Sequence, residues 1–216
     1  MEPELLQKLA ERQITKRELA EEVESDLALL PVVVAGVLSA KASVRYSCAS
    51  LLVNLSAKHP ERLYQNFGFF VSLLDSKHRI LVWNGMAAIA NLCVADVDGK
   101  FDAIFDKYYG FLDDEYMVTV ANVVGNSARI VRAKPYLASR IAEELLGVDK
   151  ISISPHLTEE CKRVITEKTV EAFGEFFDLL SNADKAAVLV FVKKHADSSR
   201  VSLRKEVQRF LKQWDL

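Results

Sequence analysis

Apolar residues recur along this chain with the spacing of one face of an α-helix. One set stands at positions i, i+4, i+7, i+8 and i+11: Val44, Cys48, Leu51, Leu52 and Leu55. A second set has the same spacing: Leu81, Gly85, Ala88, Ile89 and Leu92. Because residues at these intervals lie on one side of a helix, the pattern predicts two amphipathic helices that each bury one face.

The same pattern repeats with a long period. Residues 48–54 align with residues 85–91 and 120–126, at spacings of 37 and 35 residues. Before each of these helices lies another apolar segment: 27–38, 63–74 and 101–112. Short polar turns separate the two helices of each unit: 39–42, 75–78 and 113–115. A period of this size predicts stacked helix–turn–helix units, which form a solenoid.

The first unit resembles the HEAT family. Leu29, Leu30 and Pro31, followed by Val37 and Leu38, match the first helix of that repeat, and Val44–Arg45 match the start of the second. The resemblance implies an all-α fold, an α-solenoid in which about five HEAT-like helical hairpins form a right-handed superhelix.

The later units match the HEAT pattern less evenly. The last one is similar again, with Asp197 in its turn and Leu203–Arg204 at the start of its second helix. The third has Met117 where the family has an arginine. The fourth is irregular: a helix over 135–146 is closed by Gly147, and a loop over 148–154 leads to a long helix that ends near Leu180.

We expect an N-terminal helical cap over 1–24 and a single repeat domain over 25–216. The cap contains two short polar helices, with Thr15 as the N-cap of the second and Glu18 three residues further on. The expected repeats have approximate boundaries of 25–60, 61–97, 98–133, 134–181 and 182–216.

Composition supports a helical protein without a strong electrostatic partner. Half of the 216 residues are apolar, and glycine and proline number only 8 and 5. The net charge is −2, so the molecule as a whole has no broad attraction to nucleic acid or anionic lipid. Residues 1–30 nevertheless carry eight acids and four bases, whereas residues 183–216 carry eight bases and four acids.

The sequence indicates a cytoplasmic protein without a membrane segment. The N-terminal residues lack the order of a signal peptide, and the longest apolar stretch, 27–38, is too short to span a bilayer. The three cysteines have neither disulfide nor zinc spacing, so we expect them to be reduced and buried.

No motif in the sequence indicates catalysis, a metal or a cofactor. A glycine-rich phosphate loop and the HExxH and GxSxG motifs are missing, and the four histidines are dispersed near predicted helix ends or turns. Adjacent carboxylates occur at 113–114, 143–144 and 159–160. Neighbours on a helix point about 100° apart, so we interpret these pairs as solvated charge rather than as catalytic acids and bases.

A polar and aromatic stripe flanks the core face of the second helices and is the best candidate for a binding site. Taking every fourth residue gives one set per unit: Tyr46, Ser50 and Asn54, then Trp83, Ala87 and Asn91, then Val118, Asn122 and Asn126. This stripe lies about 100 to 180° from the centre of the core face, so packing within one repeat does not use all of it.

Armadillo repeats, relatives of HEAT repeats, are similar in placing asparagines along their inner helices, where the amides bond to the backbone of an extended peptide. Asn54, Asn91 and Asn126 resemble such a ladder, and Tyr46 and Trp83 are suited to anchor a partner. The alternative is that the asparagines bond between repeats, since buried amides usually have intramolecular partners, and that Trp83 packs against the adjacent repeat.

A weaker candidate site is basic. Arg204, Lys205, Arg209 and Lys212 lie on the non-core faces of the last helix, where they would either contact phosphate or an acidic partner or form a solvated face.

We therefore expect a non-catalytic scaffold that binds a protein or peptide on the concave face of the solenoid. The sequence leaves two alternatives open. One is a HEAT-like DNA glycosylase or another nucleic-acid-binding solenoid, which the neutral stripe disfavours. The other is a structural subunit of a larger assembly, in which oppositely charged ends meet. The identity of the partner and the oligomeric state do not follow from the sequence.

Overall fold

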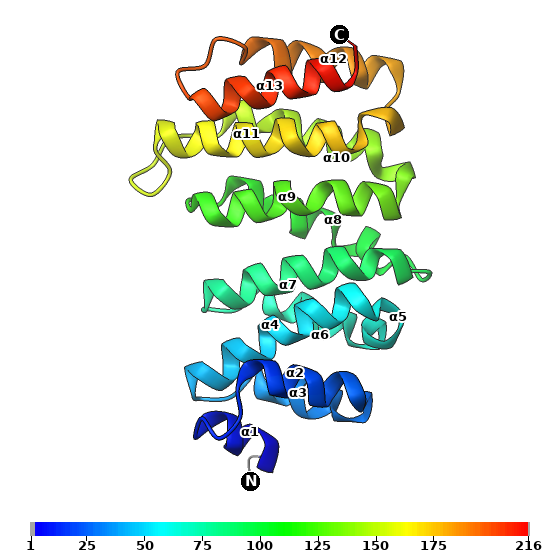
Figure 1. Cartoon of the computed structure of the whole chain (residues 1–216). Helices are drawn as coiled ribbons and strands as arrows, with labels where there is room; N and C mark the ends of the chain where they lie inside the picture. Colours follow the sequence, from blue (N-terminus) through cyan, green and yellow to red (C-terminus); the bar gives the residue numbers. More distant parts are fainter. Residues whose placement is uncertain (1–2, 216) are drawn as a thin grey trace. The chain divides into compact units, whose positions relative to one another are not determined.

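The computed structural model describes residues 3–215, and most of these residues are helical (Figure 1). The chain divides into two compact units, of which the first ends at Asp96 and the second begins at Val97. Within 3–215 there is no β-strand, only an isolated bridge between Ser154 and Leu157.

The first unit contains a pair of N-terminal helices and two helical hairpins. Its helices are α1 (Glu4–Ala10), α2 (Lys16–Ser25), α3 (Leu30–Gly36), α4 (Ala42–Lys58), α5 (Pro60–Leu63), α6 (Phe67–Leu73) and α7 (Arg79–Leu92). The first hairpin consists of α3 and α4, and the second consists of α5 and α6 followed by α7. The second helices of the two hairpins, α4 and α7, pack directly against each other, and α1 and α2 also pack against α4.

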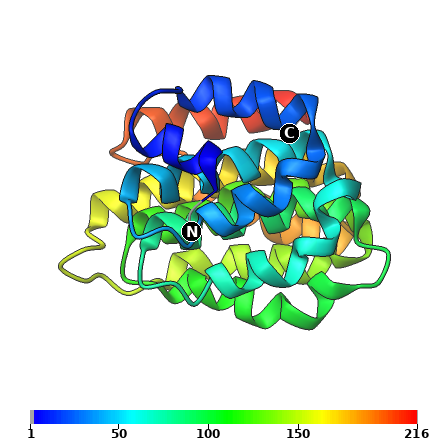
Figure 2. The ribbon, with the colours of Figure 1, turned by 90° about the horizontal axis from the view of Figure 1, so that it is seen from below.

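The second unit contains three hairpins. Its helices are α8 (Lys100–Tyr109), α9 (Met117–Ala133), α10 (Ala138–Leu146), α11 (Glu159–Phe176), α12 (Asn182–Lys194) and α13 (Val201–Gln213). The second helices α9, α11 and α13 pack in that order, with α11 in contact with both of the others. The loop between α10 and α11 projects beyond the helices in both views (Figures 1 and 2).

The predicted helices are present, because the apolar spacing that predicts them is the spacing of the buried side chains. All five residues of the first apolar set are buried on α4, and all five of the second are buried on α7. The N-cap prediction is also confirmed: the Thr15 hydroxyl accepts from Glu18 N–H, while the Glu18 carboxylate accepts from Thr15 N–H.

A recurring polar turn begins four of the five second helices. In each case a side chain accepts a hydrogen bond from the backbone N–H of the residue two positions on, which is the N-cap of the helix. The pairs are Ser39 with Lys41, Ser76 with His78, Asp114 with Tyr116 and Ser198 with Arg200. Such side chains fix a turn by offering the backbone a local partner, so they set where α4, α7, α9 and α13 begin.

Two arginines stabilise two of these turns by donating hydrogen bonds to backbone carbonyls. The Nη1 atom of Arg45 donates to the Ser39 and Ala40 carbonyls at 2.9 and 3.5 Å. The corresponding atom of Arg204 donates to the Ser198 and Ser199 carbonyls at 2.6 and 3.3 Å. The family arginine therefore closes the turn within its own hairpin.

Two sequence expectations need correction. Helix α10 ends at Leu146 with Gly147 as its C-cap, as predicted, but from Gly147, at φ −65°, the chain continues into a short 3₁₀ turn over 147–150 rather than directly into the expected loop. That turn buries Val148, and the loop begins only at Ile151. Cys48 and Cys93 are buried as expected, whereas Cys161 is half-buried in the first turn of α11.

Two mid-helix glycines give a matched test of packing between α6 and α7. A Cβ atom added to Gly85 would lie 3.0 Å from both Leu73 Cβ and the Phe70 carbonyl oxygen, whereas one added to Gly125 would meet nothing within 4 Å. Gly125→Ala should therefore raise the free energy of unfolding by about 0.5–1 kcal/mol, since alanine is the better helix former. Gly85→Ala should lower it by about 1 kcal/mol or more, because crowding outweighs that gain. Urea denaturation measures both, and an equal gain at the two positions would contradict the close contact.

Candidate functional site

Six of the residues predicted to bind a partner lie on α4 and α7 of the first unit. They are Tyr46, Ser50 and Asn54 on α4, and Trp83, Ala87 and Asn91 on α7. Asn54 is exposed, Asn91 is buried, and the other four are half-buried. The two rows occupy equivalent positions on neighbouring helices, but a partner would reach their members to different extents.

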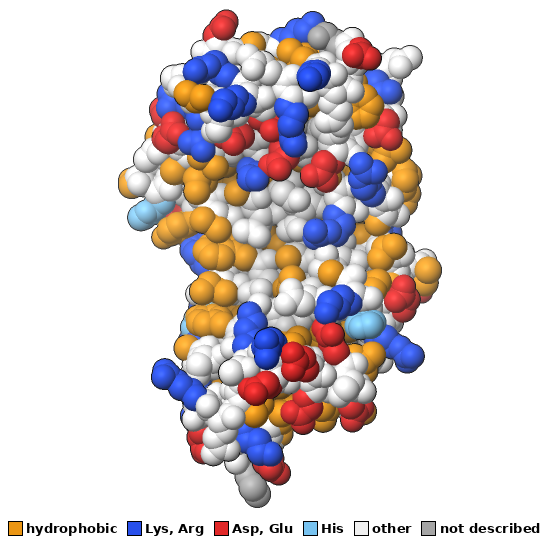
Figure 3. Space-filling view, viewed as in Figure 1, with side chains coloured by type: hydrophobic (Ala, Val, Ile, Leu, Met, Phe, Trp, Pro, Cys, Tyr) orange, Lys and Arg blue, Asp and Glu red, His pale blue; other side chains and the backbone are white. Residues whose placement is uncertain are grey.

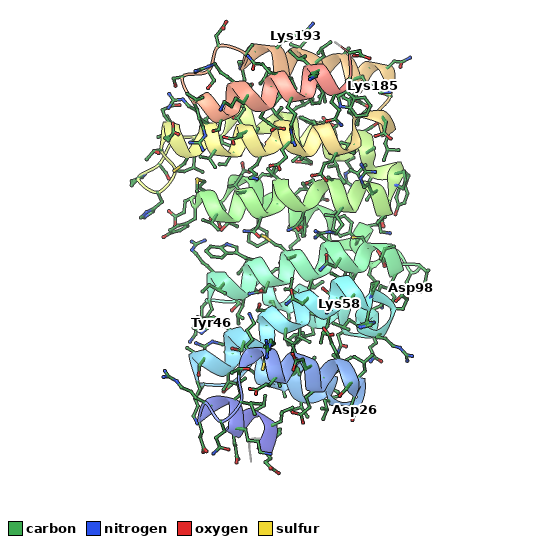
Figure 4. The ribbon with its side chains drawn as sticks, in the orientation of Figure 1. Asp26, Tyr46, Lys58, Asp98, Lys185 and Lys193 are labelled. Carbon is green, nitrogen blue, oxygen red and sulfur yellow. The ribbon has the colours of Figure 1, made fainter. Side chains whose placement is uncertain are left out.

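The N-terminal ends of α4 and α7 meet through aromatic and cationic side chains. The ring of Tyr46 packs edge-on against that of His78, with centroids 6.3 Å apart, and the Arg45 guanidinium lies 5.0 Å from the Tyr46 centroid. Desolvation, together with the nearby Arg45 and Lys77 cations, lowers the pKa of His78 below its ordinary value. Figure 4 labels Tyr46 at the end of α4 that lies beside the start of α7.

The Ser50 side chain forms a hydrogen bond within the first unit. Its hydroxyl accepts a hydrogen bond from Lys16 Nζ at 2.6 Å, and two turns along α4 the Lys58 ammonium pairs with Glu24 at 2.5 Å. Both partners come from α2, so this helix is tied along one side of α4. Ser50 therefore has a partner within the chain.

The two asparagines of the stripe in the first unit, Asn54 and Asn91, have different environments. Asn91 is 6% exposed, and its Nδ2 donates to the Val53 carbonyl at 3.1 Å and to Ser56 Oγ at 2.9 Å, both on α4. Asn54 is exposed and makes no hydrogen bond to any described residue. The Asn91 amide thus joins two repeats, and only the Asn54 amide faces solvent.

The two asparagines of the stripe in the second unit, Asn122 and Asn126, bond within α9. Asn122 Nδ2 donates to the Val118 carbonyl at 2.8 Å, and Asn126 Nδ2 donates to the Asn122 carbonyl at 2.8 Å. Asn126 is buried, and its Oδ1 also accepts from Arg129 at 3.2 Å. The ladder of three equivalent solvent-facing amides is therefore not present: Asn91 and Asn126 have intramolecular partners.

Two of the four basic residues predicted on α13 form interactions within the chain. Arg204 holds its own turn, and Arg209 pairs with Glu206 at 2.6 Å. Of these four residues, Lys205 and Lys212 are exposed and have no partner in the described part of the chain. This leaves two free charges where four were predicted.

A hollow of about 320 Å³ in the second unit is lined by carboxylates that come partly from the adjacent pairs noted in the sequence. Asp113 and Glu144 line it together with Asp106, which pairs with Arg140 at 2.5 Å. Burial raises the pKa of Glu144 above its ordinary value, while the Arg140 cation acts in the opposite direction. Among residues 3–215, no group of three or more His, Cys, Asp or Glu side chains could hold a metal ion.

Sequence reasoning missed four cations at the N-terminal ends of α4 and α7: Lys41, Arg45, Lys77 and Arg79. The signal was available, because the two polar turns each contain a lysine and the first turn of each following helix contains an arginine. It was overlooked because the four charges are distant in sequence from the basic C-terminal segment.

Known proteins resemble this chain in structure only. No protein-family model matches the sequence, and no curated protein matches it. The designed armadillo repeat protein YIII(Dq.V1)4CPAF, solved in complex with the peptide (KR)4, is similar with a TM-score of 0.63 and 16% identity, over 97% of this chain and 91% of that one. A second designed armadillo repeat protein, YIII(Dq)4CqI, has a TM-score of 0.59 and 18% identity, over 96% and 91%.

The chain has an armadillo/HEAT-like helical repeat fold. The predicted all-α solenoid is therefore confirmed, and the low identity limits the likeness to the fold. None of the described helices of this armadillo-like chain is both long enough and apolar enough to cross a membrane. The predicted division into a cap over 1–24 and one domain over 25–216 stays a prediction.

The contrast between Asn91 and Asn54 can be measured. Asn91→Ala should lower the free energy of unfolding by about 1–3 kcal/mol, because it removes two buried hydrogen bonds and leaves the Val53 carbonyl and Ser56 with fewer partners. Asn54→Ala should change it by no more than about 0.5 kcal/mol. Urea denaturation followed by circular dichroism checks both, and equal costs would show that the two amides are in similar environments.

An ion-pair cluster joins α13 to α11 and predicts a pH dependence. Arg200 pairs with Glu160 and, at 2.7 Å, with Glu167. Hydrogen bonds from Arg200 and then Arg163 hold the pKa of Glu160 below its ordinary 4.5. A carboxylate with a lowered pKa stabilises the fold above its unfolded pKa, and this stabilisation is lost as the pH falls through the folded value.

Arg200→Gln should therefore lower the urea midpoint at pH 7, and its difference from wild type should shrink once the pH falls below about 4.5. Lys205→Gln, an exposed change on the same helix, should have little effect at either pH. A loss at Arg200 that is the same at acidic and neutral pH would show that the ion pairs are not its cause.

Proposed function

We propose that this protein is a non-catalytic interaction scaffold, which holds an extended segment of a partner protein on the face formed by α4 and α7. The observation that carries the proposal is the placement of Tyr46 and Trp83 at equivalent positions of two neighbouring helices, with the exposed Asn54 amide two turns along α4.

The two kinds of side chain provide complementary contacts. Large, rigid aromatic rings are the usual anchors of protein interfaces, since they bury much area and lose little conformational freedom. An asparagine amide can donate to and accept from a peptide backbone, but one hydrogen bond contributes only about 0.5–1.5 kcal/mol net. Tyr46 and Trp83 would therefore provide most of the affinity, and Asn54 would help to set the register of the bound segment.

The structural comparison supports a peptide as the kind of ligand. One of the similar designed armadillo repeat proteins is in complex with the peptide (KR)4, so a protein of this fold can bind a peptide. The described residues provide no cluster for a metal ion, and no serine, cysteine or histidine lines the hollow that contains Asp113 and Glu144. We therefore favour binding over catalysis.

The proposal predicts that binding depends on Trp83. Purified protein is passed over a displayed library of random peptides, and the affinities of selected peptides are measured by fluorescence anisotropy for wild type and Trp83→Ala. Removing a central aromatic anchor should weaken binding about tenfold or more. Leu38→Ala is the matched control, because Leu38 is 74% exposed and lies outside α4 and α7.

Circular dichroism and urea midpoints must first show that the Trp83 variant is folded. If it is not, Asn54→Lys provides the test, since Asn54 is exposed and has no partner to lose. Peptides that bind equally well to both stripe variants, or a library that gives no specific peptide, would overturn the proposal.

A further inference from the structure

We propose that the partner segment is acidic, and that it carries an apolar residue flanked by aspartates or glutamates. It would bind at what we call the cationic end of the first unit: Lys41, Arg45 and Tyr46 at the start of α4, with Lys77, Arg79 and Trp83 at the start of α7. This inference rests on the proposed function and specifies the chemistry of its ligand.

The charge at this end is unbalanced. Residues 39–46 and 75–83 contain four arginines and lysines and a single carboxylate, Asp75. The ammonium groups of Lys41 and Lys77 are exposed and have no partner among the described residues. Arg45 donates to carbonyl oxygens rather than to a carboxylate, so its hydrogen bonds do not neutralise its charge.

The opposite end of α4 has no such surplus. There the Lys58 ammonium pairs with Glu24 at 2.5 Å. The unpaired ammonium groups of Lys41 and Lys77 therefore lie at the N-terminal ends of the two helices. The first turns of α4 and α7 add to this positive charge, since the exposed N–H groups at the start of a helix carry partial positive charge.

Apolar surface lies beside these charges. The side chain of Ile80 is 42% exposed, and Tyr46 and Trp83 are half-buried. In Figure 3, apolar side chains gather along the left edge of the first unit, at the level where α7 begins. An apolar residue of the partner would pack against these rings, and its acidic neighbours would reach the surrounding cations.

A short acidic peptide fits this surface better than a nucleic acid does. Helix α2, which is tied along α4, exposes four glutamates, Glu18, Glu21, Glu22 and Glu24, against two bases, Lys16 and Arg17. A long polyanion that continued from the cationic end along α4 would meet these carboxylates and be repelled. A short segment with its acidic residues confined to the cationic end avoids them.

The test uses the full chain with Trp214→Phe, which leaves Trp83 as the only tryptophan and so as a fluorescent reporter of the surface. Three peptides of equal length share a central leucine–phenylalanine pair, which is flanked by glutamates, by lysines or by serines. The glutamate peptide should shift the Trp83 emission and bind about tenfold more tightly than the serine peptide, and the lysine peptide should bind most weakly.

Charge reversal locates the effect. The double variant Lys41→Glu, Lys77→Glu should bind the glutamate peptide about tenfold or more weakly than wild type does, and should bind the lysine peptide more tightly. Lys205→Glu with Lys212→Glu makes the same change of net charge on α13, again at exposed lysines without partners, and should leave both affinities nearly unchanged.

The outcomes separate the two proposals. Tightest binding by the lysine or serine peptide, with a Trp83 response, would overturn the acidic ligand but keep the scaffold. A glutamate preference that both charge reversals reduce equally would also overturn the inference, since it would reflect net charge alone. If a single-stranded oligonucleotide binds more tightly than the glutamate peptide, the acidic-peptide proposal is overturned in favour of a nucleic-acid ligand. No Trp83 response to library-selected peptides would overturn the scaffold proposal itself.

Discussion

Each second helix of this fold has to be buried on two sides at once. One side packs against the first helix of its own hairpin, and another packs against the second helix of a neighbouring hairpin, as α7 does against α4 and as α11 does against α9 and α13. No single hairpin could bury both sides, so the stability of each depends on its neighbour. A polar group buried between two second helices therefore needs a hydrogen-bond partner on the neighbouring helix, since otherwise it would be buried without one.

The observed polar contacts between second helices follow from this requirement. Asn91 donates to α4, Gln213 donates to the Gly174 carbonyl at 2.9 Å, and Arg132 donates to the Glu175 carbonyl. Each places a side-chain donor against the backbone or a hydroxyl of the next helix. Since these contacts are directional, whereas apolar packing is not, they also help to fix how far one helix is shifted along another.

Much of the fold could be predicted because it depends on spacing alone. The intervals between Val44, Cys48 and Leu55 place these side chains on one helical face whatever their neighbours are, and the turns needed only short polar segments. The stripe was less predictable. Asn54 and Asn91 occupy equivalent positions in adjacent repeats. The neighbour of Asn91 is α4, to which its amide donates, whereas the neighbour on the equivalent side of α4 is the shorter helix α2. Sequence periodicity identifies the faces of a helix, but it does not specify which other element packs against each face.

Cationic residues of the first unit have two separate roles. Arg45 closes the turn before α4, whereas the ammonium groups of Lys41 and Lys77 have no partner among residues 3–215. Under the proposed function, substitutions at these two lysines would therefore change the charge that a partner meets at little cost in stability, so binding preference and the stability of the stack could vary independently.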